Sequence, residues 1–240
     1  MIHRVYLQSR RWLAHDVLGL WLQLPADSPF RYRPGQYIDL LLDDGRRRSF
    51  SIANAPDGGA LELHVRVRPG GQFGRWAAQE MPEHAQLRFE GPLGGFHLRD
   101  DRRQPILLVG GGTGIAPLQA MLEDLLRRGD PRPLHLFWGV RTQRDLYLHE
   151  RLQQWAQAHR QLHYLPVLSE PDPDWTGARG FVHEAVLHRL PSLRGFDAYL
   201  SGPPAMIEAG RSALVAAGLD PQRLFYDAFE HAFETWPSLG

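Results

Sequence analysis

The chain has 240 residues, 27 basic and 27 acidic side chains and no cysteine. A formal net charge of zero gives no long-range attraction to nucleic acid or to an anionic membrane. The missing cysteine excludes a disulfide, a thiol nucleophile and a thiolate-bound iron–sulfur cluster within these residues, and the missing lysine excludes a P-loop lysine and a Schiff base.

The N-terminal segment lacks the continuous apolar core and the small-residue cleavage site of a signal peptide. No apolar run reaches the ~20 residues that a membrane span needs. We therefore expect a soluble, cytoplasmic protein with room for two domains.

Up to about residue 100 the apolar residues alternate with a period of two. The stretch "HDVLGLWLQLP" places Leu18, Leu20, Leu22 and Leu24 on one face. The stretch "GALELHVRVRPGG" places an apolar face opposite a polar face that holds Glu62, His64, Arg66 and Arg68. Residues 85–92 alternate as well, and turn signals such as Pro34-Gly35 and Pro69-Gly70-Gly71 separate these runs. Short alternating strands predict an antiparallel barrel or sandwich over residues 1–100.

After a charged linker, "HLRDDRRQ", the pattern changes and Pro105 opens a second domain over residues 101–240. Buried strands of the parallel type now alternate with amphipathic helices, which predicts a doubly wound α/β domain. Strands are expected over 105–112, 133–140, 162–168, 197–202 and 223–229, and helices over 116–129, 147–159, 181–190 and 205–218.

The stretch "LLVGGGTGIAP" reads as a strand, a glycine-rich turn and the start of a helix. Glycines at 110, 111, 112 and 114 let the backbone approach a ligand, Thr113 is positioned to cap, and Pro117 suits a first helical turn. The N–H groups of a helix start favour a pyrophosphate; an ordinary glycine-rich turn is the alternative. The dinucleotide fingerprint G-x-G-x-x-G is absent, because Ile115 stands at its last position. The next strand ends "FWGVR", without a carboxylate for a ribose.

Three motifs, "RRSFSIA", "GGTGIAP" and "YLSGPPAMI", occur in this order. Together they resemble the ferredoxin–NADP⁺ reductase superfamily, most closely its NAD(P)H-dependent flavin reductases and oxygenase-reductase components. The resemblance runs from "YRPGQYI" to "LFYDAF" and implies a flavin-binding barrel followed by a nicotinamide-binding domain. It also implies hydride transfer from NADH or NADPH to FAD, with FMN or riboflavin as alternatives and the flavin either prosthetic or a dissociable substrate. The sequence does not name the electron acceptor: free flavin, a separate ferredoxin and an oxygenase are all open.

The resemblance assigns flavin contacts in the first domain. Arg48 would pair with a flavin phosphate, Phe50 would stack on the isoalloxazine, and Ser51 would hydrogen-bond near its N5 atom; Ser49 and Ile52 complete the segment. A glycine-rich helix start would face the flavin pyrophosphate, through Gly70, Gly71, Gln72 and Gly74. Relatives often have Ser or Thr where this chain has Gly74, and Arg75 either compensates or is a surface arginine.

In the second domain the resemblance assigns nicotinamide contacts. The residues are Gly111, Gly112, Thr113, Gly114, Pro117, Ser201, Gly202, Pro203 and Met206. Ser201 stands where relatives often have a cysteine beside the nicotinamide, so Ser51 and Ser201 are the predicted catalytic residues. The C-terminal segment with Asp227 and Phe229 matches the part that approaches the flavin, where Phe229 either shields the ring or belongs to the core.

The nucleotide choice is predicted from the stretch "LPVLSEPDPDW". NADP-selective relatives have a Ser-Arg pair here, whereas this chain has Ser169 and then Glu170, with Asp172 and Asp174 close behind. A carboxylate would repel the 2′-phosphate of NADPH. Arg141 and Arg144 could reach that phosphate from the preceding strand, but we expect NADH to be preferred by about tenfold.

No metal site is expected. His183 and His188 are five residues apart on one predicted helix, which separates them by about 140°, and His159 and His163 straddle a helix end. A G-x-S-x-G hydrolase elbow is also absent. A non-catalytic flavin or nucleotide sensor on the same fold is the alternative to an enzyme.

Overall fold

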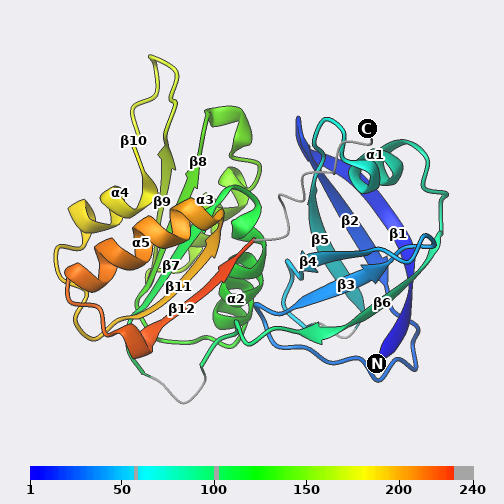
Figure 1. Cartoon of the computed structure of the whole chain (residues 1–240). Coiled ribbons are helices and arrows are strands. Elements are labelled where there is room, and N and C mark those ends of the chain that lie inside the picture. The colour runs from blue at the N-terminus through cyan, green and yellow to red at the C-terminus, as the bar shows by residue number, and fades with distance from the viewer. Residues whose placement is uncertain (57–58, 100–102, 230–240) are drawn as a thin grey trace.

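The computed structural model describes residues 1–56, 59–99 and 103–229, which form two six-stranded sheets that lie side by side (Figure 1). This arrangement confirms the predicted fold class, an antiparallel barrel followed by a doubly wound parallel sheet. Among the described residues, no helix is long and apolar enough to cross a membrane.

The barrel has the strand order β4-β3-β6-β1-β2-β5. Its strands are β1 (Ile2–Ala14), β2 (Val17–Gln23), β3 (Tyr37–Leu41), β4 (Arg47–Ser51), β5 (Ala60–Arg66) and β6 (Gln86–Leu93). The chain beyond β4 closes the barrel against β5, because Ile52 bridges Leu63 and the N–H of Ala53 donates to the carbonyl of Glu62 at 2.8 Å. Helix α1 (Gln72–Gln79) packs Phe73 and Ala77 onto the barrel core.

The second sheet is parallel, in the order β10-β9-β8-β7-β11-β12. Its strands are β7 (Ile106–Gly111), β8 (Leu134–Val140), β9 (Leu162–Leu168), β10 (Ala178–Arg179), β11 (Asp197–Gly202) and β12 (Leu224–Ala228). Helices α2 (Ile115–Arg127) and α3 (His149–Ala158) cover one face, and α4 (Val182–Arg189) and α5 (Pro204–Ala216) cover the other (Figure 1). Each face therefore has its own apolar core.

The β7–α2 unit shows why the sequence folds this way. Every residue of β7 is buried, as expected for a strand covered by helices on both faces. Helix α2 turns one apolar stripe to the sheet, and Gly129, at φ +64°, ends it in the left-handed conformation that glycine adopts without strain.

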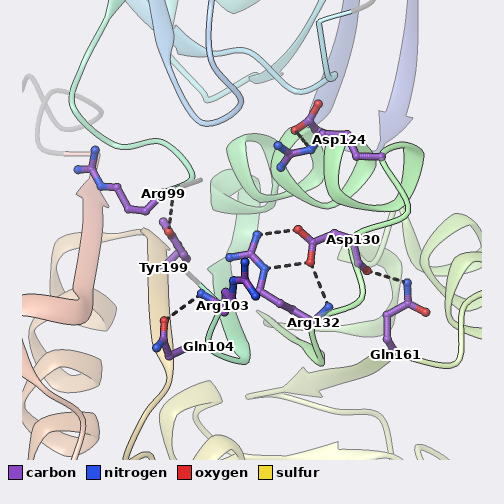
Figure 2. Close-up of polar contacts among 9 residues, drawn as sticks. Arg99, Arg103, Gln104, Asp124, Asp130, Arg132, Gln161 and Tyr199 are labelled. Carbon is purple, nitrogen blue, oxygen red and sulfur yellow. Dashed lines mark hydrogen bonds and ion pairs between the residues drawn. The ribbon is translucent and has the colours of Figure 1, made fainter. Parts of the chain in front are cut away.

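Polar contacts lie near the amino-terminal end of the parallel sheet, where the connection from the barrel arrives (Figure 2). The backbone N–H of Arg99 donates to the Tyr199 hydroxyl at 3.0 Å. Arg132 donates from Nε and Nη2 to Asp130 at 2.9 and 2.8 Å, which closes the loop before β8. The predicted domain boundary after residue 100 lies outside the described residues.

Candidate functional site

The glycine-rich turn brings the ends of β7 and β11 into backbone contact. A short 3₁₀ turn, η1 (Gly112–Gly114), joins β7 to α2. A Cβ on Gly114 would lie 2.1 Å from the carbonyl oxygen of Ser201, so only glycine fits there. Gly112 has φ +55°, and its carbonyl accepts a hydrogen bond from Trp138 Nε1 at 2.9 Å. The predicted strand–turn–helix unit is therefore present and rigidly packed.

The predicted cap by Thr113 is wrong. Thr113 lies inside the 3₁₀ turn, and the residue that caps α2 is Gly114, which has no side chain to accept a hydrogen bond. The first-turn N–H groups of α2 thus receive no side-chain cap. This leaves the start of α2, with Pro117 in its first turn, able to bind an anionic ligand.

Ser201 ends the neighbouring strand and is fully buried. Within the described residues its hydroxyl has no hydrogen-bond partner, which is uncommon for a buried polar atom. Gly202 follows at φ +151°, Pro203 precedes α5, and a Cβ on Gly111 would lie 2.4 Å from Met206 Sδ. The structure gathers these residues beside the glycine turn, but the contact between Ser201 and a nicotinamide stays a prediction.

Asp227 is half-buried next to this strand end. It lies beside Ser201 in the register of β11 and β12, and burial raises its pKa to about 6. Burial, and then the charges of Asp39 and Asp227, raise the pKa of Tyr37, which pairs with Ser51 in the barrel. The charge of Asp227 at the end of β12 is therefore felt at Tyr37 of β3. Phe229 is half-buried here and its N–H donates to the carbonyl of Gly202 at 3.1 Å.

The predicted flavin segment is strand β4, and its side chains alternate between two environments. Phe50 is half-buried, with its ring 5.2 Å from that of Phe73 on α1. Arg48 is also half-buried and donates from Nη1 to the carbonyl of Arg47 at 2.8 Å. By contrast, Ser49 is exposed and donates to Asp39 at 2.6 Å. Ile52 is fully buried in the barrel core, so only its backbone could meet a ligand.

The second flavin segment forms the start of α1. Gly70 has φ +79°, and Gly71 is the N-cap without a side-chain hydrogen bond. A Cβ on Gly74 would lie 3.1 Å from the Cα of Val67. This tight contact gives a physical reason for the glycine at position 74. Gln72 is exposed, and Arg75 lies 3.7 Å from Glu80, so Arg75 has a surface ion pair.

Arg141 and Glu170 form a direct ion pair at the carboxyl ends of β8 and β9. Arg141 donates from Nε at 3.1 Å and from Nη2 at 2.8 Å to the two carboxylate oxygens. The Arg141 hydrogen bond lowers the pKa of Glu170. Sequence analysis treated the two residues as opposing influences on a 2′-phosphate, whereas the structure joins them in one pair.

The polar face of β5 forms an interdomain contact that sequence analysis missed. His64 Nε2 lies 2.9 Å from Glu62 Oε1, and His64 Nδ1 lies 3.1 Å from the hydroxyl of Tyr147 in the second domain. Gln119 of α2 also donates to Glu62, at 3.4 Å. Burial, which raises the pKa of Glu62, is outweighed by the hydrogen bond and charge of His64, so this pKa is lowered. An ionised Glu62 places the His64 proton on Nε2 and leaves Nδ1 to accept from Tyr147.

Among the described residues, one group has ligand atoms close enough for a metal ion: His15, Asp16 and Asp145, within 4.8 Å of one another. Asp145 already accepts hydrogen bonds from the N–H and hydroxyl of Thr142, both at 2.9 Å. His15 lies 3.7 Å from Asp145 and 3.9 Å from Asp16. The contact between His15 and Asp145 crosses the domain boundary, whereas His15 and Asp16 are neighbours in the turn between β1 and β2.

Comparisons with known proteins agree with this geometry. Residues 4–98 match the oxidoreductase FAD-binding domain, and residues 108–212 match the oxidoreductase NAD-binding domain. The CDP-6-deoxy-L-threo-D-glycero-4-hexulose-3-dehydrase reductase of Yersinia pestis is 43% identical over 224 residues, which are 93% of this chain and 67% of that protein. The reductase component of the Pseudomonas putida naphthalene 1,2-dioxygenase system, a ferredoxin–NAD(P)(+) reductase, is 35% identical, covering 90% of this chain and 65% of that protein.

A solved structure, the Amycolatopsis cytochrome P450 reductase GcoB, superposes with a TM-score of 0.87 at 35% identity. The alignment covers 95% of this chain and 70% of that one. The chain thus spans about two thirds of the length of the relatives that it matches.

Fold and site define a flavin- and nicotinamide-dependent oxidoreductase. The chain belongs to the ferredoxin–NADP⁺ reductase superfamily, as its motifs predicted. This membership favours an enzyme over the sensor alternative.

The described residues fit FAD. The cradle consists of the half-buried ring of Phe50, the cation Arg48 beside it and the start of α1, whose cap is a glycine. When bound, FAD supplies a ring that accepts hydride and passes electrons on. Arg48 and the α1 N–H groups would hold its phosphates, and Phe50 and Ser51 would meet its ring.

Proposed function

We propose that the chain takes hydride from NADH onto bound FAD and delivers the electrons to a separate acceptor protein, a ferredoxin or an oxygenase. One observation carries the proposal. The charge of Asp227, the register partner of Ser201, acts on Tyr37, the register partner of Ser51, and this supports a flavin site and a nicotinamide site near each other.

The residues proposed for the site act by binding and orientation. The glycine turn and the uncapped start of α2 bind the dinucleotide pyrophosphate. Ser201 and Met206 fix the position of the nicotinamide, while Phe50 and Ser51 fix the flavin ring. Hydride transfer then needs the two rings aligned and water excluded. Residues that bind and orient the two cofactors are sufficient for this.

A separate acceptor is supported by the relatives, whose names describe reductase components of dioxygenase and demethylase systems. Because the chain contains no cysteine, no thiolate-bound iron–sulfur cluster is available within it to take the electrons. We also retain the division into residues 1–100 and 101–240, and a location in the cytoplasm, as parts of the proposal.

The preference for NADH is supported by the Arg141–Glu170 pair. Glu170 accepts both hydrogen bonds of the Arg141 fork, so the guanidinium is not presented to a 2′-phosphate. The Glu170 side chain is itself exposed, so its carboxylate can also accept hydrogen bonds from the ribose hydroxyls of NADH.

Steady-state NADH oxidation tests the proposed function. Purified protein is mixed with NADH and with FAD, FMN or riboflavin, and absorbance at the nicotinamide band is followed with cytochrome c as the terminal acceptor. We expect FAD-dependent NADH consumption with reduction of the acceptor. Binding of NADH and FAD without NADH consumption would support the sensor alternative instead.

A further inference from the structure

A tryptophan of the neighbouring strand holds the glycine-rich turn. Gly112 has φ +55°, and because glycine is conformationally permissive, its own backbone does little to fix the direction of the peptide that follows. The carbonyl of Gly112 accepts a hydrogen bond from Trp138 Nε1 at 2.9 Å. It also accepts from the N–H of Ile115, but that N–H is shared with the carbonyl of Thr113. Trp138 is therefore the unshared donor to the Gly112 carbonyl.

The Trp138 side chain is itself fixed in place. It lies on β8, beside Gly110 in the register of β7, and it is fully buried. Its ring packs edge-on against Tyr147 at 5.2 Å, and the Tyr147 hydroxyl lies 3.1 Å from His64 Nδ1 of the barrel. A ring enclosed in this way keeps one orientation, because a close-packed core leaves no space for it to rotate. Its N–H is consequently a fixed donor.

A fixed carbonyl also fixes the N–H group on the other side of its peptide bond. The peptide between Gly112 and Thr113 is trans, so its C=O and N–H point in opposite directions. Because the Gly112 carbonyl points at the buried ring of Trp138, the Thr113 N–H points away from that core. This N–H immediately precedes the N–H groups at the start of α2, which receive no side-chain cap.

We infer that Trp138 is a positioning residue for the nicotinamide dinucleotide: by holding the Gly112 carbonyl, it directs the Thr113 N–H at the pyrophosphate. The inference rests on the proposed function and adds to it a residue that acts through the backbone. Without the indole N–H, the peptide after Gly112 can rotate. Only the fraction of molecules whose Thr113 N–H points outward then binds at full strength, so the apparent affinity falls.

Direct binding to the FAD-loaded protein tests this role by isothermal titration. ADP-ribose carries the pyrophosphate, and adenosine carries no phosphate. Two replacements remove the donor. Trp138→Phe also reduces the ring, whereas site-specific replacement of Trp138 by 3-benzothienylalanine keeps the ring size and exchanges the N–H for sulfur. We expect each to weaken ADP-ribose by about fivefold, as for the loss of one neutral hydrogen bond, and to change adenosine by less than about twofold.

Trp175→Phe is the matched control, because Trp175 Nε1 also donates to a backbone carbonyl of the second domain, that of Ala178, at 3.0 Å. It should leave the ratio of the two affinities unchanged. Full ADP-ribose affinity in the benzothienylalanine protein would overturn the inference, since the ring would then act by packing alone. An equal loss for ADP-ribose and adenosine would also overturn it, as would the same change of ratio in Trp175→Phe.

Reduction of the bound flavin by NADH gives a second readout that a general loss of packing would not reproduce. Loss of the donor should raise the apparent Kd for NADH by about fivefold and leave the limiting rate within about twofold. The reason is that the Thr113 N–H meets the pyrophosphate and not the reacting rings. A fall in the limiting rate at an unchanged apparent Kd would contradict the role of Trp138.

Failure of the proposed function gives a different result in the titration. If the chain is not a nicotinamide-dependent reductase, the unmodified protein binds neither NAD⁺ nor ADP-ribose. If only the role of Trp138 is incorrect, the unmodified protein binds both, and the benzothienylalanine protein binds them equally well.

Discussion

Arg48 is predicted to bind the phosphate of a flavin, so its loss should affect only flavins that carry a phosphate. We predict that Arg48→Ala weakens FAD and FMN by about 1.5–3 kcal/mol, because a charge-assisted pair is lost, and leaves riboflavin unchanged. Fluorescence titration of the three flavins checks this. Arg46→Ala is the control, because Arg46 pairs with Asp44 in the turn before β4. Equal weakening of all three flavins would remove Arg48 from the phosphate role.

Glu170 controls the direction of the Arg141 fork. We predict that Glu170→Gln shifts the ratio of kcat/KM for NADPH over NADH upward by about tenfold, or about 1.4 kcal/mol, because Arg141 is released toward a 2′-phosphate. The ratio is measured at one salt concentration. Glu150→Gln, an exposed carboxylate on α3, should not move it. An unchanged ratio in Glu170→Gln would mean that the pair does not meet the 2′-position.

Within the described residues, the buried hydroxyl of Ser201 has no hydrogen-bond partner. A polar atom in that state costs free energy, so we predict that Ser201→Ala raises the free energy of unfolding by about 1 kcal/mol in the absence of nucleotide. Urea denaturation measures it. A loss of stability would show that the hydroxyl has a partner in solution.

Ser201→Cys tests the other role predicted for this position. It should keep or raise the rate of hydride transfer, since it restores the residue that relatives often have beside the nicotinamide. Stopped-flow reduction measures the rate, and flavin affinity should stay the same, because Ser201 lies in the other domain. A large fall in rate would give the hydroxyl a function that sulfur performs poorly.

At the scale of elements, the structure contains two similar tyrosine–histidine hydrogen bonds with different positions. Tyr147 meets His64 across the domain boundary at 3.1 Å, and Tyr164 meets His149 within the second domain at 3.1 Å. We predict that Tyr147→Phe and Tyr164→Phe each cost about 1 kcal/mol of stability. Only Tyr147→Phe should slow flavin reduction by NADH, because it alone loosens the docking of β5. Equal rates in the two variants would contradict a positioning role for this contact.

The regular elements could be predicted because their patterns are local. The period-2 runs of β2 and β5, and the alternation of buried strands with amphipathic helices after residue 105, are visible in short windows. Strand β1 was missed, because its alternation breaks at a register shift between Leu7 and Ser9. A bulge of this kind depends on the partner strand and has no signal of its own.

Only those parts of the site that carry a sequence motif could be predicted. The glycine turn and β4 were located, but the burial of Glu62 and His64 was not, because a polar strand face ordinarily indicates solvent. Tertiary contact with Tyr147 and Gln119 overrides that pattern. The pairing of Arg141 with Glu170 was missed for the same reason, since the two residues are 29 positions apart.

At the scale of the whole molecule, the domain boundary combines polar contacts with apolar packing, in which Phe96 and Leu98 join a core of the second domain. It contains the β5 network, and the N–H of Ala55 donates to Glu123 of α2 at 2.7 Å. Hydrogen bonds have directional geometry, so such a boundary fixes the orientation of two domains more closely than apolar packing does. A fixed orientation is what hydride transfer between two bound rings requires.

Single-turnover reduction of the FAD-loaded protein tests the central claim most directly. NADH is mixed with the protein without oxygen, and the flavin absorbance band is followed in a stopped-flow instrument. The account predicts that the band is lost in one fast phase whose rate saturates with NADH, and that the ratio of the limiting rate to the apparent Kd is about tenfold lower for NADPH. A flavin band that persists in the presence of saturating NADH would contradict it.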